Sequence, residues 1–399
     1  MKRVVFCWEL GGNYGHITSF LPLYRELRAL GLQVDFVLRD LTFAKKLMGD
    51  LSARCWQAPV MEVDALTEAY SYVDILAQIG YLNVDRLTSH VGKWREVLSE
   101  RCADIIVANH APSALLAART LGIPATVFGS GFLIPPLVDP LPVFHIWNDI
   151  AEEKINRNSE NVLTAINGAL VHFNVEPLSA IYELFAVAER FLCTVPELDH
   201  YLERNEEDYW GPYFVYDIGI EPKWPSKQGP KIFAYLTARV KSLDLLLEQL
   251  SEVDGVKLVH IPSASPELLE RYRSINMHIE TEPLNMSAVL SSACLVIHQA
   301  GIGTSSACLF AGVRQLLLPT QLEQALTCKR LVSQGLAYGL DPNASGLNYA
   351  ESIKLAMDCP IMERSLGKFK EKYRGFDQRE QYSFISKVIV DLIDAQHKA

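Results

Sequence analysis

The sequence contains no uninterrupted apolar run of the roughly 18 residues that a membrane-spanning helix needs. Its first residues, Met1-Lys2-Arg3, lead into a short apolar stretch that ends at Glu9, too short for the core of a secretory signal peptide. We therefore expect neither a membrane span nor a signal peptide. The expectation is a cytoplasmic protein with at most peripheral membrane contact.

The sequence also lacks closely paired cysteines and an excess of positive charge. The eight cysteines include no C-x-x-C pair, which disfavours a disulfide framework or a zinc site and indicates reduced, mostly buried thiols. The formal net charge of -10 argues against nucleic acid as the main partner. No G-x-G-x-x-G fingerprint of dinucleotide binding occurs, so a nicotinamide-dependent dehydrogenase is only a distant alternative.

What the sequence does contain suits a chain of two domains. Its 399 residues are too many for one ordinary hydrophobic core and fit two domains of roughly 200 residues each. Proline, glycine and charge cluster in residues 221–230, which we predict to be the linker. The prediction is a first domain over 1–220, a second over 231–375, and a C-terminal helical segment over 376–399.

Both halves begin with a buried strand, a loop and a helix. In the first half, Val4–Trp8 is followed by a glycine-rich loop at 9–15 and by apolar residues at helical spacing up to Gly31. In the second half we predict a strand over 231–236, a helix over 242–250 and a strand over 256–261. These alternations predict α/β domains with Rossmann-like parallel sheets. We also predict strands at 34–38, 104–108, 123–128, 169–173 and 190–194, and helices at 91–100, 114–121, 150–170, 177–188 and 382–395.

The most informative stretch is 295–340. A short apolar strand ends in the turn Gln299-Ala300-Gly301-Ile302-Gly303, and Thr304, Ser305 and Ser306 are suitable caps for a helix that Gly312 ends. Such a helix starts at the carboxyl end of a strand with free N–H groups and the positive end of its dipole. It is an anion site, and a phosphate is its natural ligand.

This stretch resembles the donor-sugar signature of the glycosyltransferase family that includes bacterial natural-product, plant secondary-metabolite and glucuronosyl transferases. In that family a strand, an H-G-G-x-G-T type turn, a helix ending A-G-V-P, a strand, a Pro and an acidic residue plus Gln follow one another. With Ala311-Gly312-Val313 as the anchor, the family's diphosphate-binding His falls on Gln299, and His298 lies one residue earlier. The matching residues are Gly301, Gly303, Thr304, Ala311-Gly312-Val313, Pro319 and Glu323-Gln324.

The resemblance implies the GT-B architecture, in which two Rossmann-like domains face each other across a cleft and the C-terminal helix returns to the first domain. It implies inverting transfer of a hexose from a nucleotide diphosphate sugar, expected to be a UDP-sugar, to an acceptor hydroxyl. It also implies no cofactor and no metal, because the helix start replaces the cation electrostatically.

The first glycine loop carries the second match. Gly15-His16-Ile17 and Leu21-Pro22-Leu23 are similar to the family's G-H-V-x-P-L-L-P-L opening, whose His is the general base. A neutral imidazole can take the proton of an acceptor hydroxyl at neutral pH. The resemblance therefore implies that His16 is the base; the alternative is that it only packs at the helix start.

The third match is the block around the strand at 104–108. In the plant branch of the family an Asp just after this strand supports the base, and here the position holds Asn109, which can orient an imidazole but adds no charge. His110 is a second catalytic candidate, and a loop histidine bonded to backbone is the equal alternative. Either Asn109 orients His16, or a carboxylate such as Asp85 or Asp139 does.

The remaining site predictions follow from position in the fold. Phe132 and Pro135, on the loop 129–142, are expected to line the acceptor site. Glu323 and Gln324 would hold the sugar hydroxyls, although an acidic residue at a helix start is also common for structural reasons. The full set of expected donor contacts is Gly12, Arg239, His298, Gln299, Gly301, Gly303, Thr304, Ser305, Glu323 and Gln324. Glu282 and Pro283 are weaker candidates for a contact with the uracil base of the donor.

Two other functions remain open at this point. A nucleotide-sugar epimerase shares the two-domain architecture. A nucleotide-sugar-binding protein without catalysis would fit Gln299 and Asn109, which stand where the family uses chargeable groups. The acceptor stays unidentified: a small lipophilic metabolite, a glycolipid and a peptide are all compatible with the acceptor half.

Overall fold

The computed structural model describes residues 2–12, 15–42, 44, 48, 51, 54–61, 69–144, 157–201, 204, 209–214, 219–237, 240–262 and 264–396. The chain forms two compact units. Unit 1 comprises Met1–Val195, Tyr201–Gly211 and Asp377–Ala399, and unit 2 comprises Pro196–His200 and Pro212–Phe376. The continuous part of unit 2 thus begins at Pro212, nine residues before the segment 221–230. The chain returns to unit 1 at Asp377.

Unit 1 is built on a parallel sheet of six strands in the order β3-β2-β1-β4-β5-β6. Because β2 and β4 lie on opposite sides of β1, the strand order reverses there, and ligands of such sheets bind at the carboxyl ends beside this point. Trp8 and Asn109, the last residues of β1 and β4, are paired in register. The strands are β1 Arg3–Trp8, β2 Gln33–Leu38, β3 Cys55–Gln57, β4 Ile105–Asn109, β5 Ala125–Gly129 and β6 Glu189–Leu192.

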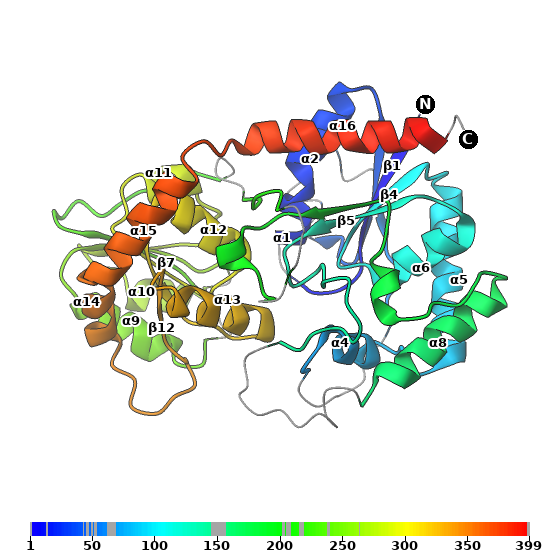
Figure 1. The fold of residues 1–399 in the computed structure, drawn as a ribbon. Helices are drawn as coiled ribbons and strands as arrows, with labels where there is room; N and C mark the ends of the chain where they lie inside the picture. Colours follow the sequence, from blue (N-terminus) through cyan, green and yellow to red (C-terminus); the bar gives the residue numbers. More distant parts are fainter. Residues whose placement is uncertain are drawn as a thin grey trace. The chain divides into compact units, whose positions relative to one another are not determined.

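The helices of unit 1 include the last one of the chain. α16, Gln378–Gln396, packs against α2, Phe20–Ala29, and Figure 1 shows it in red crossing that helix. Lys2 and Asp394 form an ion pair, and Gln381 Nε2 donates to the carbonyl of Gly211 over 2.5 Å. The other helices are α1 Gly15–Thr18, α4 Tyr72–Gln78, α5 Val84–Glu100, α6 Pro112–Leu121, α8 Ser159–His172 and the 3₁₀ turn Ile181–Leu184.

Unit 2 repeats the plan with a second six-stranded parallel sheet, in the order β12-β11-β10-β7-β8-β9. Here the order reverses between β7 and β10. The strands are β7 Lys231–Tyr235, β8 Val256–His260, β9 Met277–Glu280, β10 Leu295–His298, β11 Arg314–Leu317 and β12 Tyr338–Gly339. The helices are α9 Leu243–Glu252, α10 Pro266–Arg271, α11 Met286–Leu290, α12 Ile302–Ala311, α13 Leu322–Ser333, α14 Tyr349–Met357 and α15 Pro360–Lys372.

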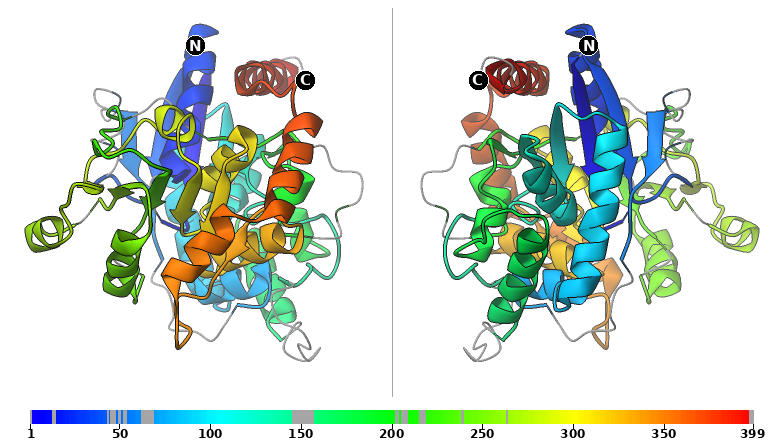
Figure 2. Two further views of the ribbon diagram at one scale, coloured as in Figure 1. Left: turned by 90° about the vertical axis from the view of Figure 1, so that its left-hand side faces the viewer. Right: turned by 90° about the vertical axis from the view of Figure 1, so that its right-hand side faces the viewer.

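Helices cover both faces of the unit 2 sheet, as Figure 2 shows. Along β10, Leu295 and Ile297 join one apolar cluster with α9 and α14, whereas Val296 joins another with α11 and α12. This explains why the buried strands read as continuous apolar runs. The two Rossmann-like α/β sheets confirm the predicted fold class.

Four local predictions were wrong. Residues 169–173 do not form a strand, because Ala169 and Leu170 continue the helical stripe of α8 and are buried with Val162 and Ile166. The helix predicted at 177–188 is only the short 3₁₀ turn, since Asn167 bonds both the N–H and the carbonyl of Leu178, at 2.7 and 2.9 Å. α5 also begins at Val84, earlier than predicted, with the side chain of Asn83 as its cap.

The fourth wrong prediction concerns the start of α12. It was predicted to be capped by Thr304, Ser305 or Ser306, but the cap position is Gly301 and the helix begins at Ile302. At the other end Gly312 has φ 72° in the left-handed region, as predicted for a terminating glycine. Among the described residues, no helix is long and apolar enough to cross a membrane.

Candidate functional site

His16 lies at the start of α1, where the glycine loop after β1 turns into the helix. Its Nδ1 is 2.6 Å from Oδ1 of Asn109, and Nδ2 of the same amide donates to the carbonyl of Phe128 over 2.8 Å. The second bond fixes the orientation of the amide, so its oxygen faces His16. Because an amide oxygen only accepts, Nδ1 of His16 carries the proton and Nε2 carries the lone pair.

The loop backbone fits closely around this imidazole. The ring of His16 is stacked on Trp8, with centroids 5.1 Å apart at 15°. Gly11 has φ +81°, and a Cβ added there would lie 2.6 Å from Nε2 of His16. Glycine is therefore required at position 11 both for the backbone angle and for the space beside the lone pair.

Burial keeps this histidine neutral. Removal from water lowers the pKa of His16 to about 4, the hydrogen bond that His16 donates to Asn109 opposes the shift, and the positive charge of Arg39 adds to it. At neutral pH the side chain is thus uncharged, with Nε2 able to accept a proton. A neutral, oriented imidazole is what a general base requires.

His110, the residue after β4, lies beside His16. It is buried and has a left-handed backbone with φ 50°, and its ring centroid is 6.1 Å from that of His16. Its carbonyl accepts from the N–H of Leu10 over 2.9 Å. Burial lowers the pKa of His110 well below its usual value, with His16 and Arg39 adding to the shift. Both histidines therefore lie neutral at the carboxyl ends of β1 and β4.

Of the two residues expected to line the acceptor site, Phe132 lies beside this pair of histidines. Phe132 packs edge-on to the ring of His110, with centroids 6.1 Å apart, and stacks on Phe144 at 5.2 Å. Pro135 is buried, and its carbonyl accepts from Arg190 over 2.6 Å. Asp139 is exposed.

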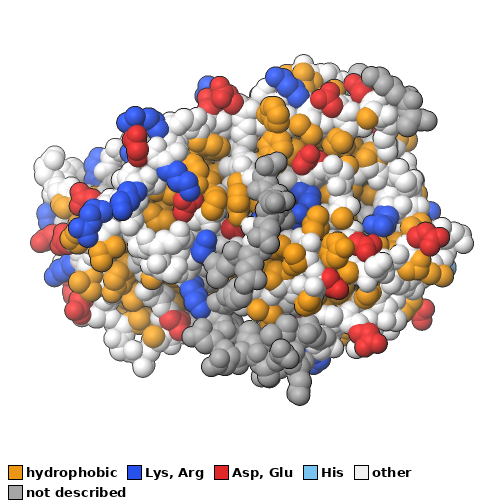
Figure 3. Space-filling model, viewed as in Figure 1, with side chains coloured by type: hydrophobic (Ala, Val, Ile, Leu, Met, Phe, Trp, Pro, Cys, Tyr) orange, Lys and Arg blue, Asp and Glu red, His pale blue; other side chains and the backbone are white. Residues whose placement is uncertain are grey.

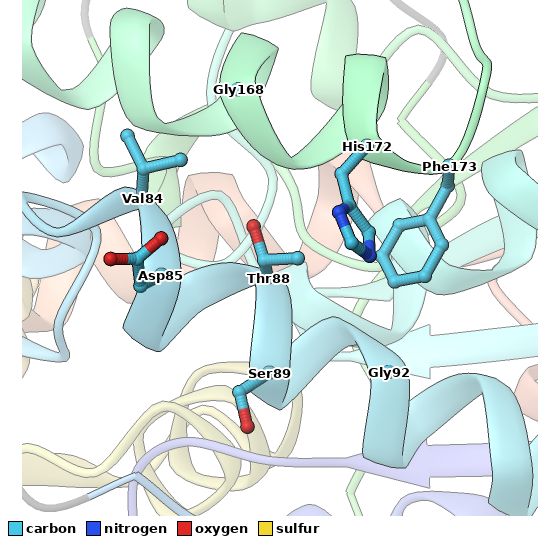
Figure 4. Close-up of a pocket in the computed structure, with 8 residues that line it drawn as sticks. All are labelled: Val84, Asp85, Thr88, Ser89, Gly92, Gly168, His172 and Phe173. Atoms are coloured by element: carbon cyan, nitrogen blue, oxygen red, sulfur yellow. The ribbon is translucent and has the colours of Figure 1, made fainter.

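Asp85 lies on α5 and lines a surface groove between α5 and α8 (Figure 4). Gly92 and Gly168 are among its lining residues, and a Cβ built on Gly168 would lie 2.5 Å from Cγ1 of Val84. None of the other predicted site residues lines it. Of the three groups considered as partners for His16, it is Asn109 that contacts the imidazole.

Glu9 is a buried carboxylate that no sequence pattern singled out as a site residue. One of its oxygens is 2.8 Å from Nε2 of His90 on α5, and the other accepts from the N–H of Ser113 at the start of α6 over 2.9 Å. Arg39 donates to its carbonyl over 2.8 Å. Glu9 thus ties the loop that carries Gly11 to two helices; the only signal in the sequence is an acidic residue between a buried strand and a glycine loop.

In unit 2 the start of α12 is open. The N–H groups of Ile302, Gly303 and Thr304 have no acceptor within the helix, because an α-helix leaves its first N–H groups unpaired. A Cβ built on Gly301 or Gly303 meets nothing within 4 Å. Backbone donors, helix dipole and open space together make this a place where a phosphate can bind.

Two predicted donor residues lie elsewhere. Ser305 is fully buried, and its N–H is bonded to the carbonyl of Gly301 over 2.9 Å, so this N–H is not among the free donors at the helix start. His298 is also buried, with Nε2 at 3.0 Å from Oε1 of Gln315 on β11. Burial lowers the pKa of His298 to about 4, and the bond to Gln315 opposes the shift. His298 is therefore a neutral, buried residue at the end of β10.

Gln299, the next residue, leaves the strand and contacts the loop after β11. Its Nε2 donates to Oγ1 of Thr320 over 3.1 Å, and Thr320 in turn bonds Oε1 of Gln324. Gln324 and the partly buried Glu323 lie in the first turn of α13. The structure thus brings Gln299 and Gln324 to one threonine, which the sequence did not predict.

The remaining candidates are Gly12, Arg239, Glu282 and Pro283. Gly12 is exposed in the first loop, and Arg239 lies outside the described residues. The N–H of Glu282 is bonded to Oε1 of Glu280 over 3.1 Å, and the carbonyl of Pro283 accepts from Ile220 over 2.8 Å. In the part of the chain that the structure describes, no three His, Cys, Asp or Glu side chains gather as a metal site. On the face shown in Figure 3, acidic and basic side chains of the described residues are interspersed with apolar ones.

No family model matches this chain, and no curated protein matches it by sequence. Solved structures match along its whole length. The glycosyltransferase of kitacinnamycin has a TM-score of 0.70 and 16% identity, and 98% of each chain is covered. The glycosyltransferase VinC, solved in complex with dTDP, has a TM-score of 0.65 and 13% identity over 98% of this chain and 100% of that one.

The spinosyn rhamnosyltransferase SpnG, solved with the spinosyn aglycone, has a TM-score of 0.64 and 14% identity over 98% of this chain and 100% of that one. At such identities a likeness establishes the fold. The resemblance drawn from the three sequence motifs is thereby confirmed at the level of architecture. The chain has the GT-B fold, as these natural-product glycosyltransferases do.

Proposed function

We propose that the protein is an inverting, metal-independent glycosyltransferase that moves a hexose from a nucleotide diphosphate sugar to an acceptor hydroxyl. The observation that carries the proposal is the orientation of His16 by Asn109, whose amide is itself fixed by Phe128. This places the lone pair of an uncharged imidazole beside the glycine loop. The full-length likeness to glycosyltransferases supports the same activity.

In the proposed reaction Nε2 of His16 takes the proton of the acceptor hydroxyl. The acceptor oxygen attacks the anomeric carbon, and the bond from that carbon to the diphosphate oxygen breaks on the opposite face, which inverts the configuration. The electron pair leaves with the diphosphate. Asn109 accepts from Nδ1 and so stabilises the imidazolium by orientation, without the charge that an aspartate would add.

The donor contacts of the proposal lie in unit 2. The N–H groups of Ile302, Gly303 and Thr304 would take the negative charge that develops on the diphosphate. Gln299 would donate one hydrogen bond to the same group, and Glu323 with Gln324 would hold the sugar. We propose UDP or dTDP as the nucleotide and a small molecule as the acceptor, since VinC was solved with dTDP and SpnG with an aglycone.

The test compares His16→Ala with the wild type. Release of nucleoside diphosphate from UDP-glucose or dTDP-glucose is followed in the presence of a panel of phenols and alcohols. We expect transfer to fall by about 100-fold or more in the variant, because a general base contributes on that order, while calorimetric binding of UDP or dTDP is retained. His172→Ala, in the groove between α5 and α8, serves as the control. Turnover by His16→Ala at the wild-type rate would refute the proposal.

A second candidate is a nucleotide-sugar-binding protein without catalysis. The specific observation in its favour is that Asn109 and Gln299, both uncharged, occupy the two positions where the resembling family has chargeable groups. Binding of nucleotide sugar without turnover on any acceptor would favour it. Incubation with the nucleotide sugar alone separates both from an epimerase, which needs no acceptor.

A further inference from the structure

Thr320 joins two residues that contact different parts of the proposed donor. It follows β11, between Gln299 at the end of β10 and Gln324 in the first turn of α13. The hydroxyl of Thr320 accepts from Nε2 of Gln299 over 3.1 Å. Its N–H and its hydroxyl both lie within hydrogen-bond distance of Oε1 of Gln324, at 2.9 and 3.0 Å.

The directions of these bonds are fixed by chemistry. A backbone N–H only donates, so the N–H of Thr320 requires the oxygen of Gln324 on its side and turns the NH₂ group of that amide away. The single hydroxyl proton of Thr320 goes to the same oxygen. The hydroxyl oxygen then accepts from Gln299, which must present its nitrogen. One threonine therefore sets the orientation of both amides.

The consequence is that both amides hold their N–H groups in a fixed orientation. Gln324, whose oxygen is occupied, has N–H groups left to offer, and these suit the oxygen of a sugar hydroxyl. Gln299 has a second N–H, which suits a diphosphate oxygen. Held in advance, the two long side chains lose less rotamer freedom when the donor binds than free glutamines would.

We propose that Thr320 is a positioning residue that couples recognition of the diphosphate through Gln299 to recognition of the sugar through Gln324. This inference rests on the proposed function, because it assumes that the donor lies along this edge of unit 2. It assigns Thr320 no contact with the donor. Its action passes through the two amides.

Two substitutions separate the hydroxyl from the rest of the side chain. Thr320→Val keeps the shape and the backbone N–H but removes the hydroxyl, whereas Thr320→Ser keeps the hydroxyl. Binding of UDP, dTDP, UDP-glucose and dTDP-glucose is measured by calorimetry without acceptor. We expect Val to weaken binding of the nucleotide sugar at least 10-fold and binding of the free nucleotide about 3-fold, and Ser to restore both to within about 2-fold of wild type. Melting curves of each variant check the fold.

A double-mutant cycle tests the coupling itself. In the wild-type background the effects of Gln299→Ala and Gln324→Ala on nucleotide-sugar affinity should be non-additive by at least 5-fold, and in the Thr320→Val background they should add to within about 2-fold. Additive effects in the wild-type background, or equal affinities of the Val and Ser variants, would overturn the inference.

These readouts are independent of catalysis. A wild-type protein that binds the nucleotide sugar but glycosylates no acceptor defeats the proposed function and leaves the coupling measurable. A wild-type protein that binds none of the four nucleotides overturns both.

Discussion

The surroundings of His16 determine its protonation state, and this state makes the pH dependence of the reaction predictable. Burial lowers the pKa of His16 to about 4, so the base is already free of its proton well below neutral pH. For the proposed transfer we expect kcat/KM to be flat from about pH 8 to about pH 5 and to decline only toward pH 4. An ordinary histidine would give a decline near 6.5.

The substitution Asn109→Asp tests how the partner of His16 affects the pKa of that imidazole. A carboxylate 2.6 Å from Nδ1 would favour the imidazolium and raise the pKa of His16, so the acid limb of the profile should move to higher pH. The profile is measured with one acceptor under kcat/KM conditions for both proteins. An acid limb at the same pH in both would show that another group controls it.

Gly11 gives a second prediction, with a control matched in backbone angle. Gly11→Ala would place a Cβ 2.6 Å from Nε2 of His16 and is expected to lower transfer about 100-fold or more. Gly31 has nearly the same φ, +82° against +81°, but open space around it. Gly31→Ala should therefore cost similar stability, about 1 kcal/mol, and leave transfer unchanged. Equal activity of the two variants would exclude a steric role for position 11.

At the scale of elements, a negative charge at the start of α12 should have opposite effects on stability and on nucleotide affinity. Gly303→Asp puts a carboxylate in the first turn, where it stabilises the helix by up to about 1 kcal/mol but repels a diphosphate. The melting temperature should stay or rise while the affinity for UDP or dTDP falls at least 10-fold by calorimetry. Gly303→Ala isolates the effect of side-chain volume. A drop in melting temperature together with unchanged affinity would speak against a phosphate site here.

Elements with a strong local cause could be predicted from the sequence. Gly312 ends α12 in the left-handed region because few other residues adopt that backbone readily, and the buried strand Val4–Trp8 has the length and composition of a parallel strand. The strand prediction for 169–173 was wrong, because a short apolar run fits either a strand or the buried stripe of a helix. These residues are helical because they continue α8, whose preceding residues set the buried stripe.

The candidate site was predictable only where a motif spans neighbouring residues. His16 and the turn 299–303 could be located. The contact of His16 with Asn109 was one of two alternatives left open, because it depends on β4 lying beside β1, which no local pattern encodes. Likewise His298 and Gln299 are adjacent, and only the packing shows that the first is buried and the second bonds Thr320. Partners supplied by the tertiary fold, such as Thr320, carry no local signal.

For the whole molecule, the buried histidines make stability depend on pH. An unfolded histidine has a pKa near 6.5, whereas burial lowers the pKa of His16 and of His298 to about 4 in the folded protein. Between these values the unfolded chain binds protons that the folded chain excludes. The free energy of unfolding should thus be greatest above pH 6.5 and fall as the pH drops toward 4.

Urea unfolding at several pH values measures this dependence, and His298→Gln removes one contribution to it. The variant should lose less stability than the wild type between about pH 7 and 5, and the comparison cancels the contribution of the carboxylates. Parallel curves for the two proteins would show that His298 does not contribute.

The return of the chain to unit 1 gives the last prediction. Ile385, Ile389 and Ile393 of α16 are fully buried in that unit. Removal of residues 377–399 should destabilise unit 1 by about 5 kcal/mol and abolish transfer, while unit 2 keeps its nucleotide affinity. Circular dichroism melting and calorimetry separate the two effects. A truncated protein with an unchanged melting curve would contradict it.

The same helix sets an order of events during synthesis on the ribosome. All residues of unit 2 precede α16 in the chain, so unit 2 can complete its fold while unit 1 still lacks its final helix. Until Gln378–Gln396 has emerged, the face of α2 that α16 covers stays open to other chains. The half of the molecule that is made first is therefore the half that finishes last, and a chaperone or a slow step in translation would act on that interval.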